Sequence, residues 1–324
     1  MKKLLLSFVA FVFATVCLAQ QQLVATLTHG EEISMFYGSY AFRDAMNAAV
    51  DGDVINLSGG NFHATTINKA VSIRGTGTEV ETPTIILESF DINISEESTG
   101  LTIEGLRIPE TMNIKGTLKN VLILKNYLHN VDIQGDANLL KNFKFVNCLI
   151  DRCSSNATGY CQFLNCFIKD IWTRDNANLT TEFVSCVISK GHHLGSICYS
   201  TLLNCILVND DTYTWSSLPS TSSAFYCLAV SARGGDAYKD IATGANNQSI
   251  QDLSIFTDSD CMKDLTDAAK RTYLGSDGTP VGMYGGPLPF SLTPTYPQIT
   301  KMNVASKTTA DGKLSVDIEV SAAK

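Results

Sequence analysis

One short pattern returns along the middle of the chain and constrains the fold more than any other feature. It consists of apolar or aromatic residues, then Asn or Ser, then Cys, then two more apolar residues. It occurs at 143–150, 161–168, 181–188, 200–207 and, in a poorer form, 224–230. Its cysteines follow one another at intervals of 18, 20, 19 and 22 residues. A period of about twenty residues indicates a solenoid, because one such unit cannot bury its own apolar side chains.

The type of solenoid follows from what fills each repeat. A leucine-rich repeat would need a Leu-x-x-Leu-x-Leu register and a helical segment, and neither occurs here. Short alternating runs of β-branched and aromatic residues, punctuated by Asn and Gly, indicate strands. Strands of successive turns would pair about 4.8 Å apart, so equivalent residues would form columns. We expect one column of hydrogen-bonded amides at a tight bend, made by Asn126, Asn147, Asn165 and Asn204, with Ser185 as a substitute.

The cysteines favour packing over metal binding. Cys148, Cys166, Cys186 and Cys205 would form a second column beside the asparagines. A column spreads its members along an axis, whereas a metal site needs ligands that converge on one point. No Cys-x-x-Cys occurs in the chain. We therefore expect small buried thiols, and a disulfide between neighbouring turns would be strained.

The start of the chain resembles a secretory signal peptide. Lys2 and Lys3 precede an apolar run from 4 to 16, and Ala19 offers a small residue for cleavage. Val16 before Cys17 disfavours a lipoprotein, and no later segment is long and apolar enough to span a bilayer. The chain carries a net charge of −8, which disfavours nucleic acid and anionic membranes as partners. We predict a signal peptide at 1–19 and a secreted protein, located in the periplasm, on the cell surface or outside the cell.

Two stretches carry a family resemblance. The segments 42–50, 51–57, 59–62 and 67–75 resemble the entry of pectate-lyase-like right-handed parallel β-helix proteins, where a short capping helix leads into the first coil. The segment 278–290 is similar to the tail of exported β-helix proteins from Bacteroidetes-type bacteria, most without an assigned function. The resemblance implies an all-β, right-handed parallel β-helix over 20–296. Two strands, 299–304 and 314–320, would form a closing hairpin within 297–324.

Candidate functional residues lie in the segments between the repeats, which we expect to be long loops on one side of the stack. Aromatic side chains stack on sugar rings, carboxylates act as acids, bases or calcium ligands, and Arg or Lys neutralises a uronate. The candidates for substrate binding are Arg152, Trp172, Tyr213 and Trp215. The candidates for catalysis are Asp151, Asp170, Arg174, Lys190, His192, Asp210 and Asp211. The alternative is that these loops are polar only because loops face water, with the tryptophans covering apolar edges.

More specific functional assignments have less support in the sequence. The segment 191–196 and the pair Asp210 and Asp211 loosely resemble polygalacturonase-like hydrolases, but their order along the chain is reversed and other segments of that family are absent. A calcium-dependent lyase would need Asp151, Asp170 and Asp210 to align on successive turns beside Arg174 or Lys190. His192 and His193 are adjacent on an extended segment, so their side chains would point apart instead of sharing a metal.

The sequence thus predicts a secreted β-helix protein that binds polysaccharide along a long-loop face, with catalysis undetermined. One alternative is a polysaccharide lyase or glycoside hydrolase that uses the carboxylates and bases named above. Another is a structural or adhesive surface protein without chemistry. No cofactor is expected, with calcium left open, and oligomeric state and substrate identity are not encoded in any recognisable pattern. Residues 231–277 are the least legible part: Gly234 and Gly235 and the neighbourhood of Asn246 and Asn247 suggest loops, 264–273 suggests a brief helix, and no pattern decides whether this part continues the solenoid.

Overall fold

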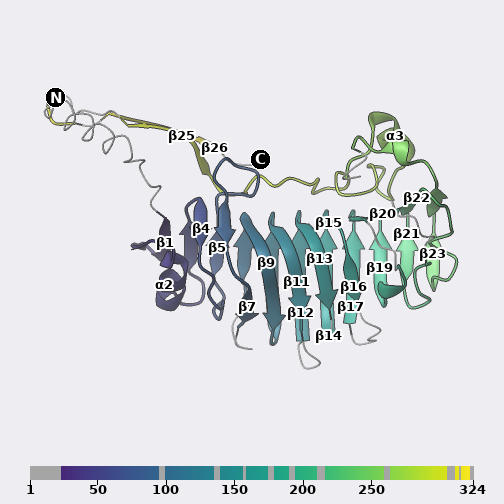
Figure 1. The fold of residues 1–324 in the computed structure, drawn as a ribbon, viewed down its shortest axis with the longest axis horizontal. Coiled ribbons are helices and arrows are strands. Elements are labelled where there is room, and N and C mark those ends of the chain that lie inside the picture. Colours follow the sequence, from purple (N-terminus) through teal and green to yellow (C-terminus); the bar gives the residue numbers. More distant parts are fainter. Residues whose placement is uncertain are drawn as a thin grey trace, which may run out of the picture.

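The chain forms a parallel β-helix whose turns stack along the long axis of the molecule (Figure 1). The computed structural model describes residues 23–94, 99–134, 139–155, 158–173, 179–189, 194–209, 216–258, 263–304, 311–313 and 315–321. The predicted signal peptide at 1–19 lies outside these ranges. Within them, no helix has the length and apolar composition that crossing a membrane requires.

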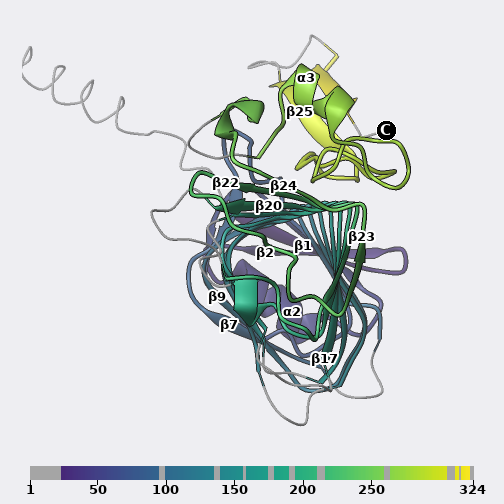
Figure 2. The same ribbon diagram turned by 90° about the vertical axis from the view of Figure 1, so that its right-hand side faces the viewer.

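Two 12-stranded sheets run the length of the solenoid, and Figure 2 shows them end-on. The first contains β2 (Glu32–Tyr37), β1 (Val24–His29), β3 (Val54–Leu57), β5 (Ser72–Arg74), β8 (Thr102–Glu104), β10 (Leu118–Leu124), β12 (Leu139–Val146), β14 (Thr158–Leu164), β17 (Leu179–Val184), β19 (Ser200–Leu203), β21 (Ser223–Phe225) and β23 (Thr243–Ala245). Its strands pair in parallel from β3 onward, while β1 pairs antiparallel with both β2 and β3.

The second sheet faces the first across the core. In order it contains β24 (Gln248–Ile250), β22 (Leu228–Ser231), β20 (Ile206–Asn209), β18 (Val187–Ser189), β15 (Phe167–Ile168), β13 (Leu149–Ser155), β11 (Tyr127–Ile133), β9 (Leu106–Lys115), β6 (Thr84–Ile86) and β4 (Gly60–Phe62). Two further strands, β7 (Phe90–Asn93) and β16 (Ile171–Thr173), extend it by pairing with β9 and β13. β23 and β24 add another turn within 231–277, where the sequence left open whether the solenoid continues.

Residues that point inward stack in register from turn to turn. The rings of Phe145 and Phe163 lie 4.8 Å apart between centroids, and those of Phe163 and Phe183 lie 5.1 Å apart. All three side chains are buried. The spacing matches the separation of paired strands, so the period of the sequence becomes a continuous aromatic column in the core.

The predicted cysteine column is present and is longer than expected. It contains Cys148, Cys166, Cys186, Cys205 and Cys227, which are buried and form no disulfide. The backbone N–H of Cys148 donates to Sγ of Cys166 at 3.4 Å, and that of Cys186 donates to Sγ of Cys205 at 3.4 Å. Burial raises the pKa of the Cys148 and Cys186 thiols well above their ordinary value. These thiols fill a narrow corner of the coil.

Asn126 belongs to this cysteine column, which corrects its predicted place among the asparagines. The register pairs Tyr127 with Leu149, so Asn126 aligns with Cys148. Its Oδ1 accepts a hydrogen bond from the Leu106 N–H at 2.8 Å, which satisfies a buried backbone donor. The prediction was wrong by one residue because Lys125, and not an asparagine, occupies the bend on this turn.

The residues of the bend itself have left-handed backbone conformations and point outward. They are Lys125, Asn147, Asn165, Ser185 and Asn204, with φ between 48° and 55°. We expected their amides to bond to one another, but they bind a segment that passes alongside the solenoid, residues 276–296, which we call the strap. Asn165 Nδ2 donates to the carbonyls of Met283 at 2.9 Å and Gly285 at 2.7 Å. An asparagine ladder does form at another corner, where Asn142 Nδ2 donates to Asn120 Oδ1 at 2.8 Å.

The remaining elements lie at the ends of the chain. Helix α2 (Ala41–Ala48) packs against β1 to β3 and buries Phe42 and Met46. Helix α3 (Asp267–Thr272) precedes the strap, and its first turn is capped by the Thr266 hydroxyl. Strands β25 (Gln298–Val304) and β26 (Val316–Ser321) form the predicted antiparallel hairpin. Two short 3₁₀ helices complete the elements, Leu194–Ser196 and Leu253–Ile255.

Candidate functional site

The segments expected to be loops are partly strands. Residues 149–155 form β13 and residues 171–173 form β16, so Asp151, Arg152 and Trp172 lie on a sheet surface. Cys153 and Ser155 point inward from β13, and Thr173 does so from β16. Because two of these buried residues are polar, the alternation of a strand was hidden in a sequence that looked uniformly hydrophilic.

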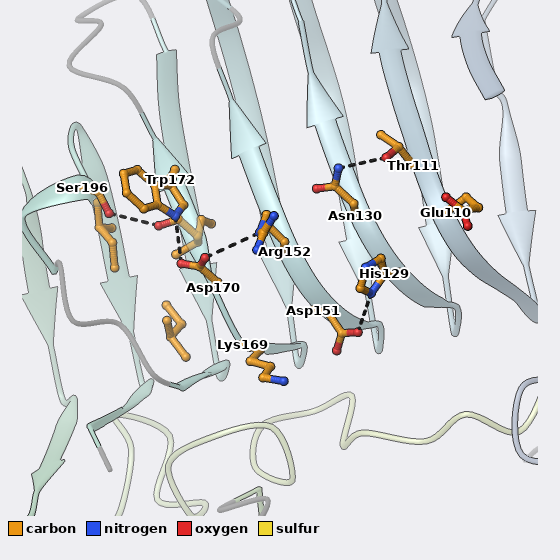
Figure 3. Close-up of a pocket in the computed structure, with 13 residues that line it drawn as sticks. Glu110, Thr111, His129, Asn130, Asp151, Arg152, Lys169, Asp170, Trp172 and Ser196 are labelled. Carbon is orange, nitrogen blue, oxygen red and sulfur yellow. Dashed lines mark hydrogen bonds and ion pairs between the residues drawn. The ribbon is translucent and has the colours of Figure 1, made fainter. Parts of the chain in front are cut away.

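A groove crosses this surface (Figure 3). It has a volume of about 460 Å³ and runs across successive turns of the solenoid. Its described lining consists of Glu110, Thr111, His129, Asn130, Asp151, Arg152, Lys169, Asp170, Ile171, Trp172, Ile188, Ser196 and Ile197. The groove therefore gathers the predicted residues Asp151, Arg152, Asp170 and Trp172 in one place.

Strand register arranges the polar lining in rows along the solenoid axis. The first row contains His129, Asp151 and Lys169. The second contains Thr111, Asn130, Arg152 and Asp170. The two carboxylates Asp151 and Asp170 therefore stand in different rows, and these two do not align on successive turns as a calcium-dependent lyase would need. Each carboxylate instead has a basic side chain as its neighbour in the row, Lys169 on the next turn for Asp151 and Arg152 on the preceding turn for Asp170.

Asp170 orients the aromatic residue of the groove. The indole Nε1 of Trp172 donates to Asp170 Oδ1 at 3.0 Å, and Arg152 Nε lies 3.8 Å from Asp170 Oδ2. The Trp172 side chain nevertheless remains 49% exposed. A large aromatic ring that is fixed at its edge and open to solvent offers a flat apolar surface beside a guanidinium group.

Asp151 forms a second polar group with residues of the preceding turn. Its Oδ2 accepts hydrogen bonds from the Tyr127 hydroxyl at 2.6 Å and from His129 Nδ1 at 3.0 Å. Burial, reinforced by the hydrogen bond to Asp151, raises the pKa of Tyr127 to about 12, so the phenol remains a donor at neutral pH. Arg107 lies over the Tyr127 ring, 5.0 Å from its centroid. With Nδ1 directed at a carboxylate, Nε2 of His129 carries the free lone pair of the neutral ring.

The side-chain amide of Asn130 carries a hydrogen-bond acceptor without a donor among the described residues. Its Nδ2 donates to the Thr111 hydroxyl at 3.0 Å, which fixes the orientation of the amide. Its Oδ1 is shielded from solvent and accepts no hydrogen bond from any described residue. An unpaired buried acceptor of this kind is unusual in a folded protein.

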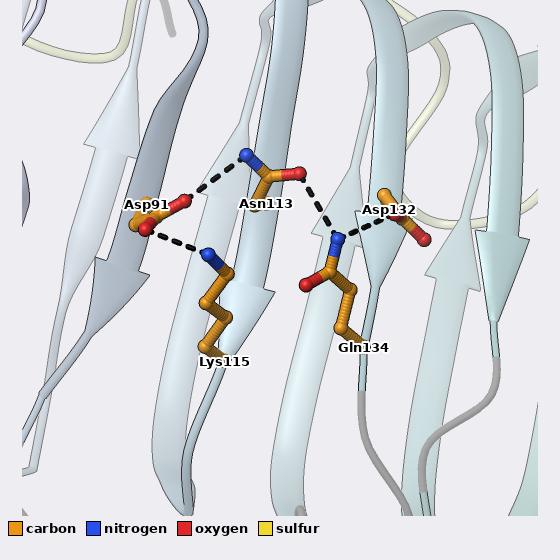
Figure 4. A network of polar contacts seen from close by, with 5 residues as sticks. All are labelled: Asp91, Asn113, Lys115, Asp132 and Gln134. Carbon is orange, nitrogen blue, oxygen red and sulfur yellow. Dashed lines mark hydrogen bonds and ion pairs between the residues drawn. The ribbon is translucent and has the colours of Figure 1, made fainter.

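The row of Trp172 continues away from the groove as a chain of hydrogen bonds, part of which Figure 4 shows. Asp132 accepts from Gln134 Nε2 at 2.7 Å and from the Ser154 hydroxyl at 3.0 Å. Asn113 Nδ2 donates to Asp91 at 3.0 Å on the preceding turn. A polar strip thus extends the outward surface of the groove along the solenoid toward its N-terminal end.

Several predicted site residues lie outside the described residues, so their place relative to the groove stays a prediction. They are Arg174, Lys190, His192, His193, Asp210, Asp211, Tyr213 and Trp215. Calcium binding by Asp151, Asp170 and Asp210 belongs with them. Among the residues that the structure describes, no group of three or more His, Cys, Asp or Glu side chains is placed to hold a metal ion.

Sequence reasoning missed His129, Asn130 and Thr111. The usable signal was the repeat itself, because 121–126 matched its first half and 127–133 should then have been aligned with 149–155. Such an alignment would have placed His129 beside Asp151 and Asn130 beside Arg152. Comparisons with protein-family models, with curated proteins and with solved structures each give no match. Any inference about what the protein binds therefore rests on the groove alone.

Proposed function

We propose that the protein is exported and binds polysaccharide in the groove between Glu110 and Ser196. The observation that carries this proposal is Trp172, half exposed, held at its edge by Asp170 and placed beside Arg152. Sugar rings pack their C–H faces against such an aromatic surface, while their hydroxyl groups bond to nearby carboxylate, amide and guanidinium groups. The export step rests on the predicted signal peptide at 1–19.

The shape of the groove favours a polymer over a small ligand. The polar rows follow the axis of the solenoid, and one turn succeeds another at the spacing of paired strands, about 4.8 Å. A linear chain laid along this axis would meet polar side chains on each turn, although their chemistry differs from turn to turn.

The test is binding to a panel of soluble polysaccharides, measured by calorimetry or on a glycan array. Trp172→Ala should weaken the affinity roughly tenfold or more, because it removes the stacking surface and leaves the carboxylate of Asp170 without its indole partner. Trp172→Phe should retain part of the affinity. Tyr37→Ala is the matched control, since Tyr37 is an exposed aromatic residue on β2, far from the groove along the solenoid. Equal affinity of the parent protein and Trp172→Ala would remove the stacking proposal, and the adhesive or structural alternative would then be favoured.

A second candidate function, catalysis on the bound chain, is favoured by the contact of His129 with Asp151. A histidine whose Nδ1 is fixed by a carboxylate is suited to transfer a proton through Nε2. Lys169 stands on the next turn of the same row and would stabilise negative charge that develops on the substrate. This arrangement suits a lyase or a hydrolase.

The two reactions leave different products. Ultraviolet absorbance detects the unsaturated ends that a lyase produces, and a reducing-end assay detects hydrolysis. His129→Ala should abolish the activity while glycan binding persists. His63→Ala is the control, because His63 forms a similar contact with Glu88 at 2.5 Å outside the groove. If neither product appears with any polysaccharide that binds, the groove is a binding site only.

A further inference from the structure

The C-terminal hairpin is amphipathic, and apolar side chains on one of its faces are exposed. Its register pairs Ile299 with Val320, Met302 with Ile318 and Val304 with Val316, whereas Lys301 pairs with Glu319. On β26 the apolar side chains are exposed, with 48% for Val316, 48% for Ile318 and 58% for Val320. A two-stranded hairpin is at best marginally stable in water, so a hairpin with one apolar face needs a surface to cover it.

The first strand of the solenoid offers such a surface. β2 is the terminal strand of its sheet and pairs only with β1 among the described strands. Its outward side chains Ile33, Met35 and Tyr37 are 66%, 58% and 55% exposed. A sheet edge with three adjacent exposed apolar residues is the kind of surface that proteins cover.

The strap leads toward this surface along one continuous row. Register places Met35, Thr26, Asn56, Arg74 and Glu104 side by side on successive strands from β2 to β8. The strap already occupies the far end of that row, because Thr295 donates through its backbone N–H and its hydroxyl to the Glu104 carboxylate. Tyr296 follows, and Arg74 lies 5.3 Å from its ring centroid. Asn56 Nδ2 continues the row by donating to the Thr26 hydroxyl at 3.3 Å.

The distances suit a contact within one chain. The hairpin begins at Gln298, two residues after Tyr296. Three strand spacings separate β5 from β2, roughly 15 Å, whereas a strand of seven residues spans roughly 23 Å. Because the strap tethers the hairpin beside its target, the effective concentration is far above that of a second molecule in solution.

We infer that the outer face of β1 and β2 is a docking surface and that its occupant is the hairpin of the same chain. Val316, Ile318 and Val320 would cover Ile33, Met35 and Tyr37, and the strap would continue its row to the end of the sheet. Figure 1 shows the hairpin leaving the strap above the N-terminal part of the solenoid and pointing away from it, and the side chains of β2 are exposed, so the contact is one that the tether permits and the apolar faces favour.

Hydrogen exchange of the full chain, followed by mass spectrometry, tests this inference. Ile318→Glu should make the amides of β2 exchange roughly tenfold faster, because it places a charge in the contact. Glu319→Ala changes the opposite face of the same strand and should leave the exchange of β2 unaltered. Met35→Glu leaves the hairpin sequence intact and should speed exchange in β26, which separates loss of docking from loss of the hairpin.

Two results would overturn the inference. One is unchanged exchange in β2 for Ile318→Glu together with unchanged exchange in β26 for Met35→Glu. The other is protection of β2 that rises with protein concentration while light scattering reports a dimer, because the occupant would then be the hairpin of a second copy.

Discussion

Inward residues of one sheet and outward residues of the other have different roles in this molecule. On β14 and β17 the inward Phe163 and Phe183 stack as nearly parallel rings in the core. On β13 and β16 the outward Arg152 and Trp172 line a groove and remain accessible. The backbone repeat is common to both, so the comparison teaches that one scaffold separates stability from recognition by the alternation of a strand. Substitutions on the two faces should therefore have different consequences.

The largest effect is expected in the aromatic column. Phe163→Ala removes a buried ring that stacks on both Phe145 and Phe183, and the rigid coil cannot close the resulting cavity. The free energy of unfolding should fall by about 3–5 kcal/mol, measured by urea denaturation. Gln162→Ala, on the outward side of the same strand, is the control. A loss below about 1 kcal/mol for Phe163→Ala would show that the column is not a source of stability.

A smaller effect is expected at the bend that carries the strap. Asn165→Ala removes the hydrogen bonds to the carbonyls of Met283 and Gly285. It also puts alanine, which tolerates the left-handed conformation less well than asparagine, at a backbone φ of 48°. The expected loss is about 2–3 kcal/mol. Asn165→Gly relieves the backbone strain but not the lost hydrogen bonds, so it should recover part of this loss. Equal stability of both variants and the parent would contradict a role for the strap in holding the turns.

The ionisation of the Tyr127 hydroxyl, which donates to Asp151 in the groove, should be detectable in a pH titration. The pKa of Tyr127 is raised from 10.0 to about 12 in the folded chain, chiefly by burial. A raised pKa of this kind contributes stability that is fully present below pH 10 and is lost as the pH rises from 10 through 12. Tyr127→Phe should remove one late step from the tyrosinate absorbance titration and reduce the alkaline loss of stability. An unchanged titration would place Tyr127 in water.

The smallest effect on stability is expected in the groove. The ion pair of Arg152 with Asp170 joins side chains that are 66% and 36% exposed, and water screens such a pair. Arg152→Ala should therefore change the free energy of unfolding by less than about 1 kcal/mol, while the affinity for polysaccharide falls. A loss as large as that of Phe163→Ala would mean that the outward face also holds the fold together.

The sequence repeat predicted the fold because its recurring residues occupy inward positions of the coil, where only certain side chains fit. Cys148, Cys166 and Cys186 could be aligned from spacing alone. Asn126 was misplaced by one residue because Lys125 adopts the left-handed bend conformation that the sequence led us to expect only of Asn or Ser. The groove was predicted in part, through Arg152 and Trp172, but not His129, since an outward histidine has no packing partner to mark its position. The binding of the strap also left no local signal, as it joins residues such as Glu104 and Thr295, 191 positions apart.

The strap changes how a repeat protein should come apart. Coils that touch only their neighbours form a nearly one-dimensional system, which can fray from either end one unit at a time. Here a single segment crosses several coils, with Ser276 bound to Asn204 at one end and Thr295 bound to Glu104 at the other. Coils between these points cannot separate unless the segment also detaches. Unfolding of that stretch should therefore be a single cooperative event, and its completion during folding must await the synthesis of residues 276–296.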